Sequence, residues 1–335
     1  METMALQAIR EDQPGPRWQE LFHRFWPSYR KWFFAAGTDE RPPRAAAEAS
    51  LRHAMPELVP TYRRLLDLAG GGTDEARFLT LYRPAPYLTG CSQAVWTGEE
   101  PALVRNYDYS PRLWEGVLLA TAWGGRRVLA MSDCLWGALD GMNDAGLSVS
   151  LSFGGRSDVG DGFGCPLILR YLLQTCAHAR EAIAALQRVP THMAYNVTAV
   201  DARGDFFTAY LSPGREPVIR RWPLATNHQE GEGWKQYAEK TASVERERVL
   251  AERLGDPSET LESLTSAFLE PPLFSTDYDG ASGTLYTAIY YPARRSMELR
   301  WPGVAMTWDF ASFQETQVPL LLPVDAQRLP APPVQ

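Results

Sequence analysis

The chain has 335 residues, of which 45% are hydrophobic, 22% are charged and 11% are aromatic. This composition excludes a disordered chain, a collagen-like chain and a disulfide-dense miniprotein, and the length allows one large domain or two ordinary ones. Lys and Arg number 33 against 40 Asp and Glu, and the resulting net charge of −7 argues against a nucleic-acid-binding protein. The sequence contains no apolar stretch of about 18 residues that would predict a membrane span.

The first 18 residues lack the basic stretch followed by an apolar stretch that is typical of a secretory signal. We therefore expect a cytoplasmic protein that binds neither a membrane nor nucleic acid. In a reducing compartment cysteines remain free thiols. Their spacing does not match a zinc site, so no metal is expected. The four cysteines are Cys91, Cys134, Cys165 and Cys176.

Residues 1–90 are predicted to be mainly helical. Aromatic residues recur every three or four positions from Trp18 to Phe33, which predicts an amphipathic helix packed on a core. A helix lying on a membrane surface is the alternative. A further helical stretch is expected at residues 45–68, broken at Pro56 and Pro60.

The region that follows is predicted to be rich in strands. Short β-prone runs, separated by Gly, Pro and charged turns, predict strands at residues 94–96, 103–107, 117–122 and 128–132. Residues 147–153 alternate apolar and polar side chains, which is typical of a half-buried strand.

Helices and hairpins follow one another in the rest of the chain. Helices are predicted at residues 166–176, 179–186, 243–254 and 261–268. Hairpins are predicted from strands at 196–200 and 206–211, and from strands at 285–291 and 297–301. This order favours antiparallel sheets with helices packed outside them over a regular βαβ array. Residues 319–335 are expected to form a loose, Pro-rich C-terminal tail.

Cys91 is the residue that says most about function. A Gly-Cys pair alone would more often mark a buried structural cysteine. However, Arg105 and Asp108 follow Cys91 by 14 and 17 residues, so that one hairpin turn would bring both beside the thiol. A cation and a carboxylate next to a thiol are the groups that tune a cysteine nucleophile.

Three more polar residues complete this candidate constellation. Asn143 stands at a turn before a strand, and Asn196 begins another strand. Their side-chain amides could donate hydrogen bonds to an oxyanion. Arg246 begins a charged helix.

These motifs resemble the N-terminal-nucleophile hydrolases, and within them the acyl-CoA:6-aminopenicillanic-acid acyltransferase branch, which is related to the choloylglycine hydrolases. The resemblance covers about residues 88–301. Residues 1–90 resemble the pro-segment of the acyltransferase branch, whose precursor is cut autocatalytically at Gly-Cys. The motifs are Gly90-Cys91-Ser92, Arg105-Asn106-Tyr107-Asp108-Tyr109, residues 141–147 (GMNDAGL), Thr226-Asn227-His228 and Ser243-x-x-Arg246.

The resemblance implies a fold and a division of the chain. The fold is of the α+β class, a four-layer αββα sandwich with two antiparallel sheets, preceded by a helical pro-segment. Residues 1–90 would be the pro-segment, retained as an α chain after cleavage between Gly90 and Cys91. Residues 91–318 would be the Ntn-hydrolase domain, or β chain.

The resemblance also implies a role for each candidate residue. Cys91 would be the nucleophile, and its freed α-amino group would be the base. The ordinary pKa values, about 8 for an α-amino group and about 8.5 for a thiol, match near neutral pH. Arg105 and Asp108 would flank the amine and the thiol. Asn143 and Asn196 would hold the oxyanion, and Arg246 would complete the polar network.

The implied function is that of an autoproteolytically activated cysteine amidohydrolase or acyltransferase. It would form a thioester on Cys91 from an acyl amide or an acyl-CoA, with no metal or organic cofactor. An apolar, aromatic pocket would suit an acyl chain or an aryl acyl group. The residues expected to form this pocket are Trp96, Tyr107, Tyr109, Trp114 and Phe163.

Plainer interpretations of the same residues stay open. Arg105 and Asp108 could form a surface ion pair, Asn143 could occupy a turn, Asn196 could pair within a sheet edge, and Arg246 could be a solvated helix charge. The aromatic residues could be ordinary core. His228 could indicate a Cys–His protease. The alternative function is an unprocessed protein that binds a small metabolite without catalysis, and the oligomeric state is undetermined.

Overall fold

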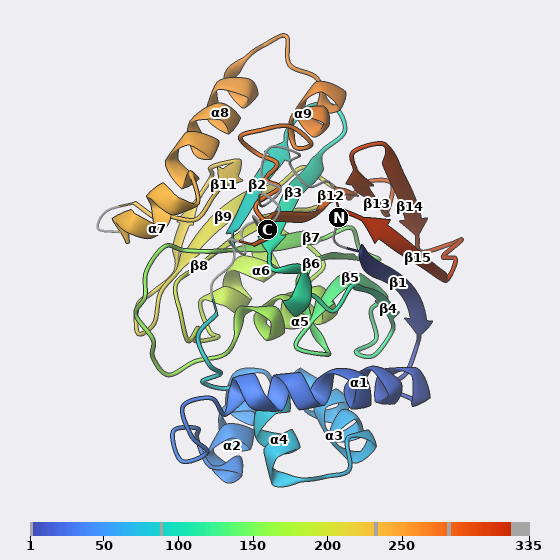
Figure 1. The fold of residues 1–335 in the computed structure, drawn as a ribbon, viewed down its shortest axis with the longest axis vertical. Coiled ribbons are helices and arrows are strands. Elements are labelled where there is room, and N and C mark those ends of the chain that lie inside the picture. Colours follow the sequence, from blue (N-terminus) through green and yellow to red (C-terminus); the bar gives the residue numbers. More distant parts are fainter. Residues whose placement is uncertain (1–2, 88–89, 231–233, 280–282, 323–335) are drawn as a thin grey trace, which may run out of the picture.

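The computed structural model describes residues 3–87, 90–230, 234–279 and 283–322 (Figure 1). In this part of the chain two sheets lie between helices. The larger sheet has nine strands in the order β10-β9-β8-β7-β6-β5-β4-β1-β15, and the smaller has six in the order β11-β2-β3-β12-β13-β14. Neighbouring strands are antiparallel except for β1 and β4, which run parallel.

The strands are short, with at most nine residues each. Those of the larger sheet are β1 (Thr3–Glu11), β4 (Val117–Thr121), β5 (Val128–Asp133), β6 (Gly137–Asn143), β7 (Ser148–Phe153), β8 (Tyr195–Val200), β9 (Phe206–Leu211), β10 (Val218–Arg220) and β15 (Thr316–Leu321). Those of the smaller sheet are β2 (Gly90–Trp96), β3 (Ala102–Tyr109), β11 (Leu224–Ala225), β12 (Gly283–Tyr291), β13 (Ser296–Trp301) and β14 (Val304–Asp309).

The helices gather into two groups at opposite ends of the molecule, with α1 to α6 on one side of the sheets and α8 and α9 on the other (Figure 1). They are α1 (Pro16–Phe33), α2 (Arg44–Ala54), α3 (Val59–Leu68), α4 (Thr73–Leu79), α5 (Cys165–Thr175), α6 (Ala179–Leu186), α7 (Lys235–Lys240), α8 (Ser243–Gly255) and α9 (Leu261–Ala267), with short 3₁₀ turns at Pro56–Leu58 and Pro111–Leu113.

Three apolar clusters fill the spaces between four layers. The first lies between the nine-stranded sheet and helices α1 to α6, the second between the two sheets, and the third between the six-stranded sheet and helices α8 and α9. Strand β4 divides its side chains by simple alternation, because Val117 and Leu119 join the first cluster whereas Leu118 and Ala120 join the second. The predicted α+β fold, a four-layer αββα sandwich, is confirmed.

The N-terminal residues form a strand that we did not predict. Strand β1 lies inside the nine-stranded sheet, between β4 and β15. Its alternate residues Met4, Leu6 and Ala8 point into the cluster between the two sheets. The first 90 residues therefore share a sheet and a core with the rest of the chain, in addition to supplying helices.

Helix α1 packs its aromatic stripe against the core, as the favoured interpretation predicted. Trp18, Leu21, Phe22 and Phe33 are buried in the first cluster. Among the described residues, the structure contains no helix with the length and apolar character needed to cross a membrane. The cysteines are free, as predicted, and all of them are buried.

Strand β7 corrects the expectation of a half-buried strand at 147–153. All six of its residues are buried. Val149 and Leu151 face the helices, whereas Ser150 and Ser152 face the second sheet, where their hydroxyls contact the amide of Gln93. The polar face of this strand is thus turned toward strand β2 and not toward water.

The predicted tail overlaps the last strand. Pro319, the first residue of that tail, lies in β15, and its partner in β1 is Ala5. A proline is tolerated there because β15 is an edge strand with a neighbour on one side only. The tail beyond residue 322 lies outside the described residues.

The burial of α1 generates a prediction about stability. Trp18 is fully buried, and its indole N–H donates to the carbonyl of Leu135 at 2.8 Å. We expect Trp18→Ala to lower the free energy of unfolding by about 3–5 kcal/mol. Trp222, which is 44% exposed, supplies the matched control. Trp222→Ala should change the free energy by no more than about 0.5 kcal/mol in the same urea titration. Equal losses in both variants would contradict this assignment of the core.

Candidate active site

Cys91 lies between the two sheets, close to the start of strand β2. It is fully buried, and its partner across the antiparallel pair is Tyr107 of β3. Gly90 pairs with Asp108 in the same register. Side chains two residues apart on a strand share a face, so Arg105 and Tyr107 point the same way as Cys91. The hairpin of β2 and β3 therefore brings the predicted cation to the thiol.

Arg105 is held by groups from both sheets. Its Nη2 donates to Cys91 Sγ at 2.9 Å and to the carbonyl of Leu151 at 3.2 Å. Its Nη1 forms an ion pair with Asp140 of β6, and both side chains are fully buried. Burial works against the charge on Arg105, but Cys91 and Asp140 beside it hold the pKa of Arg105 well above its ordinary value. The guanidinium is therefore a permanent cation at the sulfur.

Two tyrosines of β12 fix the carboxylate that faces Arg105. The Tyr286 hydroxyl donates to Asp140 Oδ2 at 2.6 Å, and the Tyr290 hydroxyl donates to the other oxygen, Oδ1. Tyr286 also lies within hydrogen-bonding distance of Arg105 Nη1, at 3.2 Å. A buried ion pair needs its remaining polar atoms satisfied, and these hydroxyls satisfy the Asp140 oxygens, whereas Arg105 Nε has no partner among the described residues.

The backbone of Cys91 is held by a second polar group. The Cys91 N–H donates to Asn227 Oδ1 at 2.8 Å. Arg246 of α8 donates to the Cys91 carbonyl at 2.6 Å through Nη1, and to the same Asn227 oxygen at 2.7 Å through Nη2. One side chain thus spans Cys91 and the residue that binds its nitrogen.

Asp108 lies beside the Gly90–Cys91 peptide. A Cβ atom at position 90 would come within 3.0 Å of the Asp108 Cβ and 3.4 Å of its Oδ2, so glycine is what lets the carboxylate approach so closely. Thr284 donates to Asp108 Oδ1 at 2.7 Å, and Arg246 lies 3.7 Å from Oδ2. Burial raises the pKa of Asp108, while Arg246 and the Thr284 hydrogen bond partly offset that rise.

The two predicted oxyanion asparagines occupy different places. Asn143 follows Met142, which points between the sheets, so Asn143 points to the opposite, helix-covered face. Its amide donates to the carbonyls of Leu173 and Cys176, at 2.9 and 2.6 Å. The structure does not bring Asn143 to Cys91, because this amide fastens the β6–β7 turn to α5.

Asn196 lies on the side of the nine-stranded sheet that faces Cys91. Its amide donates to the carbonyls of Thr226 and His228, at 2.9 and 3.0 Å. These two carbonyls flank Asn227 in the chain. Asn196 therefore holds the loop that carries Asn227, and both of its donors are engaged in doing so.

Two residues at the site were not among those predicted. Asn227 was recognised as part of a motif but was not assigned a catalytic role, and Asp140 was not singled out. The Thr226-Asn227-His228 motif was the available signal for the first. For Asp140 the signal was an acid within the run Gly137–Asn143, which we did not identify as a strand because its two glycines lower β propensity.

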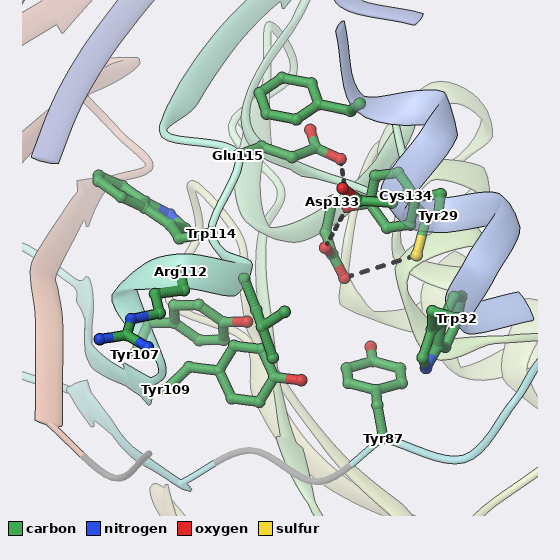
Figure 2. A pocket seen from close by; sticks show the side chains of 13 residues that line it. Tyr29, Trp32, Tyr87, Tyr107, Tyr109, Arg112, Trp114, Glu115, Asp133 and Cys134 are labelled. Carbon is green, nitrogen blue, oxygen red and sulfur yellow. Dashed lines mark hydrogen bonds between the residues drawn. The ribbon is translucent and has the colours of Figure 1, made fainter. Parts of the chain in front are cut away.

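A cavity of about 170 Å³ opens beside the site (Figure 2). Its walls come from helix α1, from the chain just before Cys91 and from strands β3 and β5 with the loop before β4. Tyr107, the cross-strand partner of Cys91, is part of its wall. The lining residues are Phe25, Ser28, Tyr29, Trp32, Tyr87, Tyr107, Tyr109, Arg112, Leu113, Trp114, Glu115, Asp133 and Cys134.

Three of the five aromatic residues predicted to form a pocket line this cavity, namely Tyr107, Tyr109 and Trp114. Trp96 does not, because it lies five positions after Cys91 on the same strand and so points to the opposite face, where it packs against the third cluster. Phe163 is buried in the first cluster, next to Tyr82.

A pair of carboxylates stands in the wall of the cavity. The Tyr29 hydroxyl lies 2.5 Å from Glu115 Oε1 and 3.1 Å from Asp133 Oδ1 (Figure 2). Burial raises the pKa of Asp133 to about 7, and the negative charge of Glu115 adds to this rise. Burial also raises the pKa of Glu115. The two carboxylates thus share the Tyr29 hydroxyl as a partner, and they lie among mostly aromatic side chains.

This raised pKa predicts how stability depends on pH. Because the folded pKa of about 7 exceeds the ordinary value of about 3.9, Asp133 favours folding below about pH 4, and this contribution is lost as the pH rises through 7. Asp133→Asn should therefore gain stability relative to the wild type between pH 4 and pH 8. Thermal unfolding at both pH values measures this difference.

Asp205→Asn, which removes an exposed carboxylate, corrects for the general effect of losing one negative charge. If the difference between Asp133→Asn and the wild type were the same at pH 4 and pH 8, Asp133 would not titrate as described.

Comparison with known proteins identifies the family. The model of the acyl-coenzyme A:6-aminopenicillanic acid acyl-transferase family matches residues 95–305. Among curated proteins, a sequence search finds no match.

Two solved structures are similar to this chain at low identity. One is penicillin V acylase from Agrobacterium tumefaciens, with 15% identity, a TM-score of 0.47, and coverage of 66% of this chain and 86% of that one. The other is a mutant of conjugated bile acid hydrolase from Clostridium perfringens, with 11% identity, a TM-score of 0.42, and coverage of 70% and 98%. The family match spans well over half of the sequence. It includes the strands and helix that carry Arg105, Asp108, Asp140 and Arg246, and the loop that carries Asn227. The chain belongs to the acyl-coenzyme A:6-aminopenicillanic acid acyl-transferase family.

Proposed function

We propose that this protein is a cysteine amidohydrolase or acyltransferase that activates itself by cutting its own chain between Gly90 and Cys91. The observation that supports this most strongly is the setting of Cys91. Its sulfur contacts a permanent guanidinium, and its backbone nitrogen is bound by a side chain that could equally bind a free amine. Family membership supports the same class of acyl-transfer chemistry.

In the first step the Cys91 thiol attacks the carbonyl carbon of Gly90. The acyl group passes from the Cys91 nitrogen to its sulfur, and water then hydrolyses the thioester. This leaves a carboxylate on Gly90 and a free α-amino group on Cys91. Glycine at position 90 keeps this peptide open to the carboxylate of Asp108, which lies against it.

In the mature enzyme the new amine is the base. It would occupy the position of the present Cys91 nitrogen, 2.8 Å from Asn227 Oδ1. There it can take the proton from its own thiol, because an α-amino group titrates near pH 8. Arg105 against the sulfur favours the thiolate that attacks the substrate.

The amide of Asn227 is the proposed donor to the oxyanion. It donates to the Phe153 carbonyl at 3.4 Å, a long hydrogen bond that can be exchanged for a shorter one to a developing negative charge. Asn196 then acts through Asn227 as a positioning residue, since it holds the carbonyls on either side of it. Arg246 fixes the Asn227 oxygen from the opposite side.

The acyl group stays on Cys91 as a thioester while the amine departs. Water completes hydrolysis, and a second amine completes acyl transfer. Acyl amides and acyl-CoA thioesters are both chemically suited as donors, and the steps described require no cofactor. The N-terminal segment would remain bound after cleavage, because β1 pairs with strands on both of its sides and α1 buries its aromatic stripe.

Self-cleavage predicts two fragments of roughly 10 and 27 kDa from the 37.5 kDa chain, the larger beginning at Cys91. Intact mass of the purified protein under denaturing conditions measures them. Under native conditions the two fragments should elute together from a sizing column.

The matched control removes a different buried thiol. Cys91→Ala should remain a single uncut chain, whereas Cys176→Ala should be cut like the wild type. An uncut wild-type chain after long incubation would contradict the proposal, and so would a Cys91→Ala chain that is cut at the same bond.

A further inference from the structure

The cavity beside Cys91 has a polarity that the acyl-transfer chemistry does not use. Tyr107 connects the two, because it pairs with Cys91 across the strands and its ring lies 5.0 Å from the Arg105 guanidinium. Cys91 itself does not line the cavity, so Tyr107 is the residue that the cavity wall and the surroundings of the thiol have in common. The wall is aromatic except for Ser28, Arg112, Leu113, Glu115, Asp133 and Cys134.

Asp133 has unused capacity to accept hydrogen bonds. Its Oδ1 lies 3.1 Å from the Tyr29 hydroxyl, whose closer partner is Glu115 at 2.5 Å. Its Oδ2 accepts from the Cys134 thiol at 3.7 Å, which is a weak donor, and the nearby Cys134 N–H, which donates to the Tyr29 hydroxyl at 2.9 Å, also helps to lower the pKa of Asp133. Glu115 is better satisfied, because it also accepts from the Leu135 N–H at 2.7 Å.

A second observation also points to a ligand. Trp114 lines the cavity and is 9% exposed, yet its indole Nε1 is buried without an acceptor among the described residues. Figure 2 shows the hydroxyls of Tyr107 and Tyr109 directed toward the side of the cavity where Asp133 and Tyr87 lie. Buried polar groups such as this indole N–H are normally paired, and since the indole only donates, an acceptor atom of a bound molecule, and not an ammonium group, would pair it.

The charge of the cavity indicates the kind of molecule. Above about pH 7, where Asp133 is ionised, its carboxylate and that of Glu115 outnumber the one guanidinium of Arg112 and disfavour an anion. Aromatic faces around a carboxylate are the setting in which proteins bind ammonium groups, through cation–π attraction and an ion pair together. The described residues contain no cluster of three or more metal-ligating side chains, and phenyl and indole rings do not coordinate a metal ion.

We propose that this cavity binds an ammonium group carried on the acyl part of the substrate, with Asp133 as its counterion and the aromatic rings as its walls. The proposal rests on the acyl-transfer function proposed above. It assigns the acyl part because that part stays on Cys91 after the amine has left, and a site within the protein beside the thiol can hold it throughout the reaction.

The N-terminal segment completes this site. Tyr29 and Trp32 of α1 lie on the side of the cavity opposite Tyr107, and the Tyr29 hydroxyl contacts Asp133 there (Figure 2). The Tyr29 hydroxyl also accepts from the Cys134 N–H at 2.9 Å, which fixes the end of β5 and hence Asp133. Recognition of the substrate would therefore require the segment before Gly90 to remain in place.

Binding can be measured without any catalysis. The full chain carrying Cys91→Ala is titrated with benzylamine and with benzyl alcohol, its neutral analogue, at pH 8 and low salt, with tryptophan fluorescence as the signal. We expect benzylamine to bind at least about tenfold more tightly, and we expect Asp133→Asn to abolish this preference. Asp74→Asn removes a carboxylate that pairs with Arg30 outside the cavity, so it should retain the preference. Equal affinity of the two compounds, or a preference that survives Asp133→Asn, would overturn the proposal.

A kinetic comparison separates this proposal from the proposed function. Two p-nitroanilides are compared, one with a phenylacetyl group and one with a 4-(aminomethyl)phenylacetyl group. We expect the second to have the lower KM by about tenfold in the wild type, and the ratio to approach one in Asp133→Asn. Turnover of both without a preference would refute the ammonium site while leaving the function intact. Preferential binding of benzylamine by a wild-type chain that stays uncut between Gly90 and Cys91 would refute the proposed function while leaving the ammonium-binding cavity in place.

Discussion

The buried guanidinium of Arg105 is the constraint around which the site is built. A cation without water must be paired, and its pairing partner, Asp140, belongs to the other sheet. The ion pair through Nη1 therefore links the two sheets across their apolar interface, and the other terminal nitrogen, Nη2, donates to the sulfur of Cys91. Removal of the acid would leave an uncompensated charge in the core, so the position of Arg105 depends on strands β3, β6 and β12 packing as they do.

The opposite side of Cys91 is organised by a second arginine. Arg246 reaches from α8 to the Cys91 carbonyl and to the Asn227 oxygen that binds the Cys91 nitrogen. Arg105 thus donates to the sulfur of Cys91, and Arg246 donates to its backbone carbonyl. Asp108 completes the arrangement, because its carboxylate lies against the glycine that precedes Cys91. A thiol, a potential amine and a peptide bond are brought together in a site from which bulk water is excluded.

The N-terminal segment belongs to the same structure and is not an appendage to it. Strand β1 lies within the nine-stranded sheet, and α1 supplies both core and cavity wall. A cut between Gly90 and Cys91 would therefore break one backbone bond, but the N-terminal segment would keep its contacts with the rest of the protein. The same α1 residues that favour retention of the segment contribute to the cavity in which we place the ammonium group.

Sequence reasoning worked where the information was local. Arg105 could be placed beside Cys91 because one hairpin connects them, and α1 was evident from its aromatic period. Asp140 could not be placed, because its approach depends on how two distant sheets stack. Asn143 was placed wrongly for a different reason. Its motif indicates a turn, but it does not indicate to which face of the strand the side chain points. Trp96 was assigned to the pocket by proximity in sequence, whereas strand alternation directs it to the other face.

The most direct measurement is to trap the acyl group on its nucleophile. The purified protein is mixed briefly with a slowly hydrolysed aryl amide and quenched in acid, and the masses of the fragments and of their peptides are determined. The proposed mechanism predicts one added acyl group, attached to the thiol of the peptide that begins at Cys91. An acyl group on another residue, or continued turnover by Cys91→Ala, would contradict it.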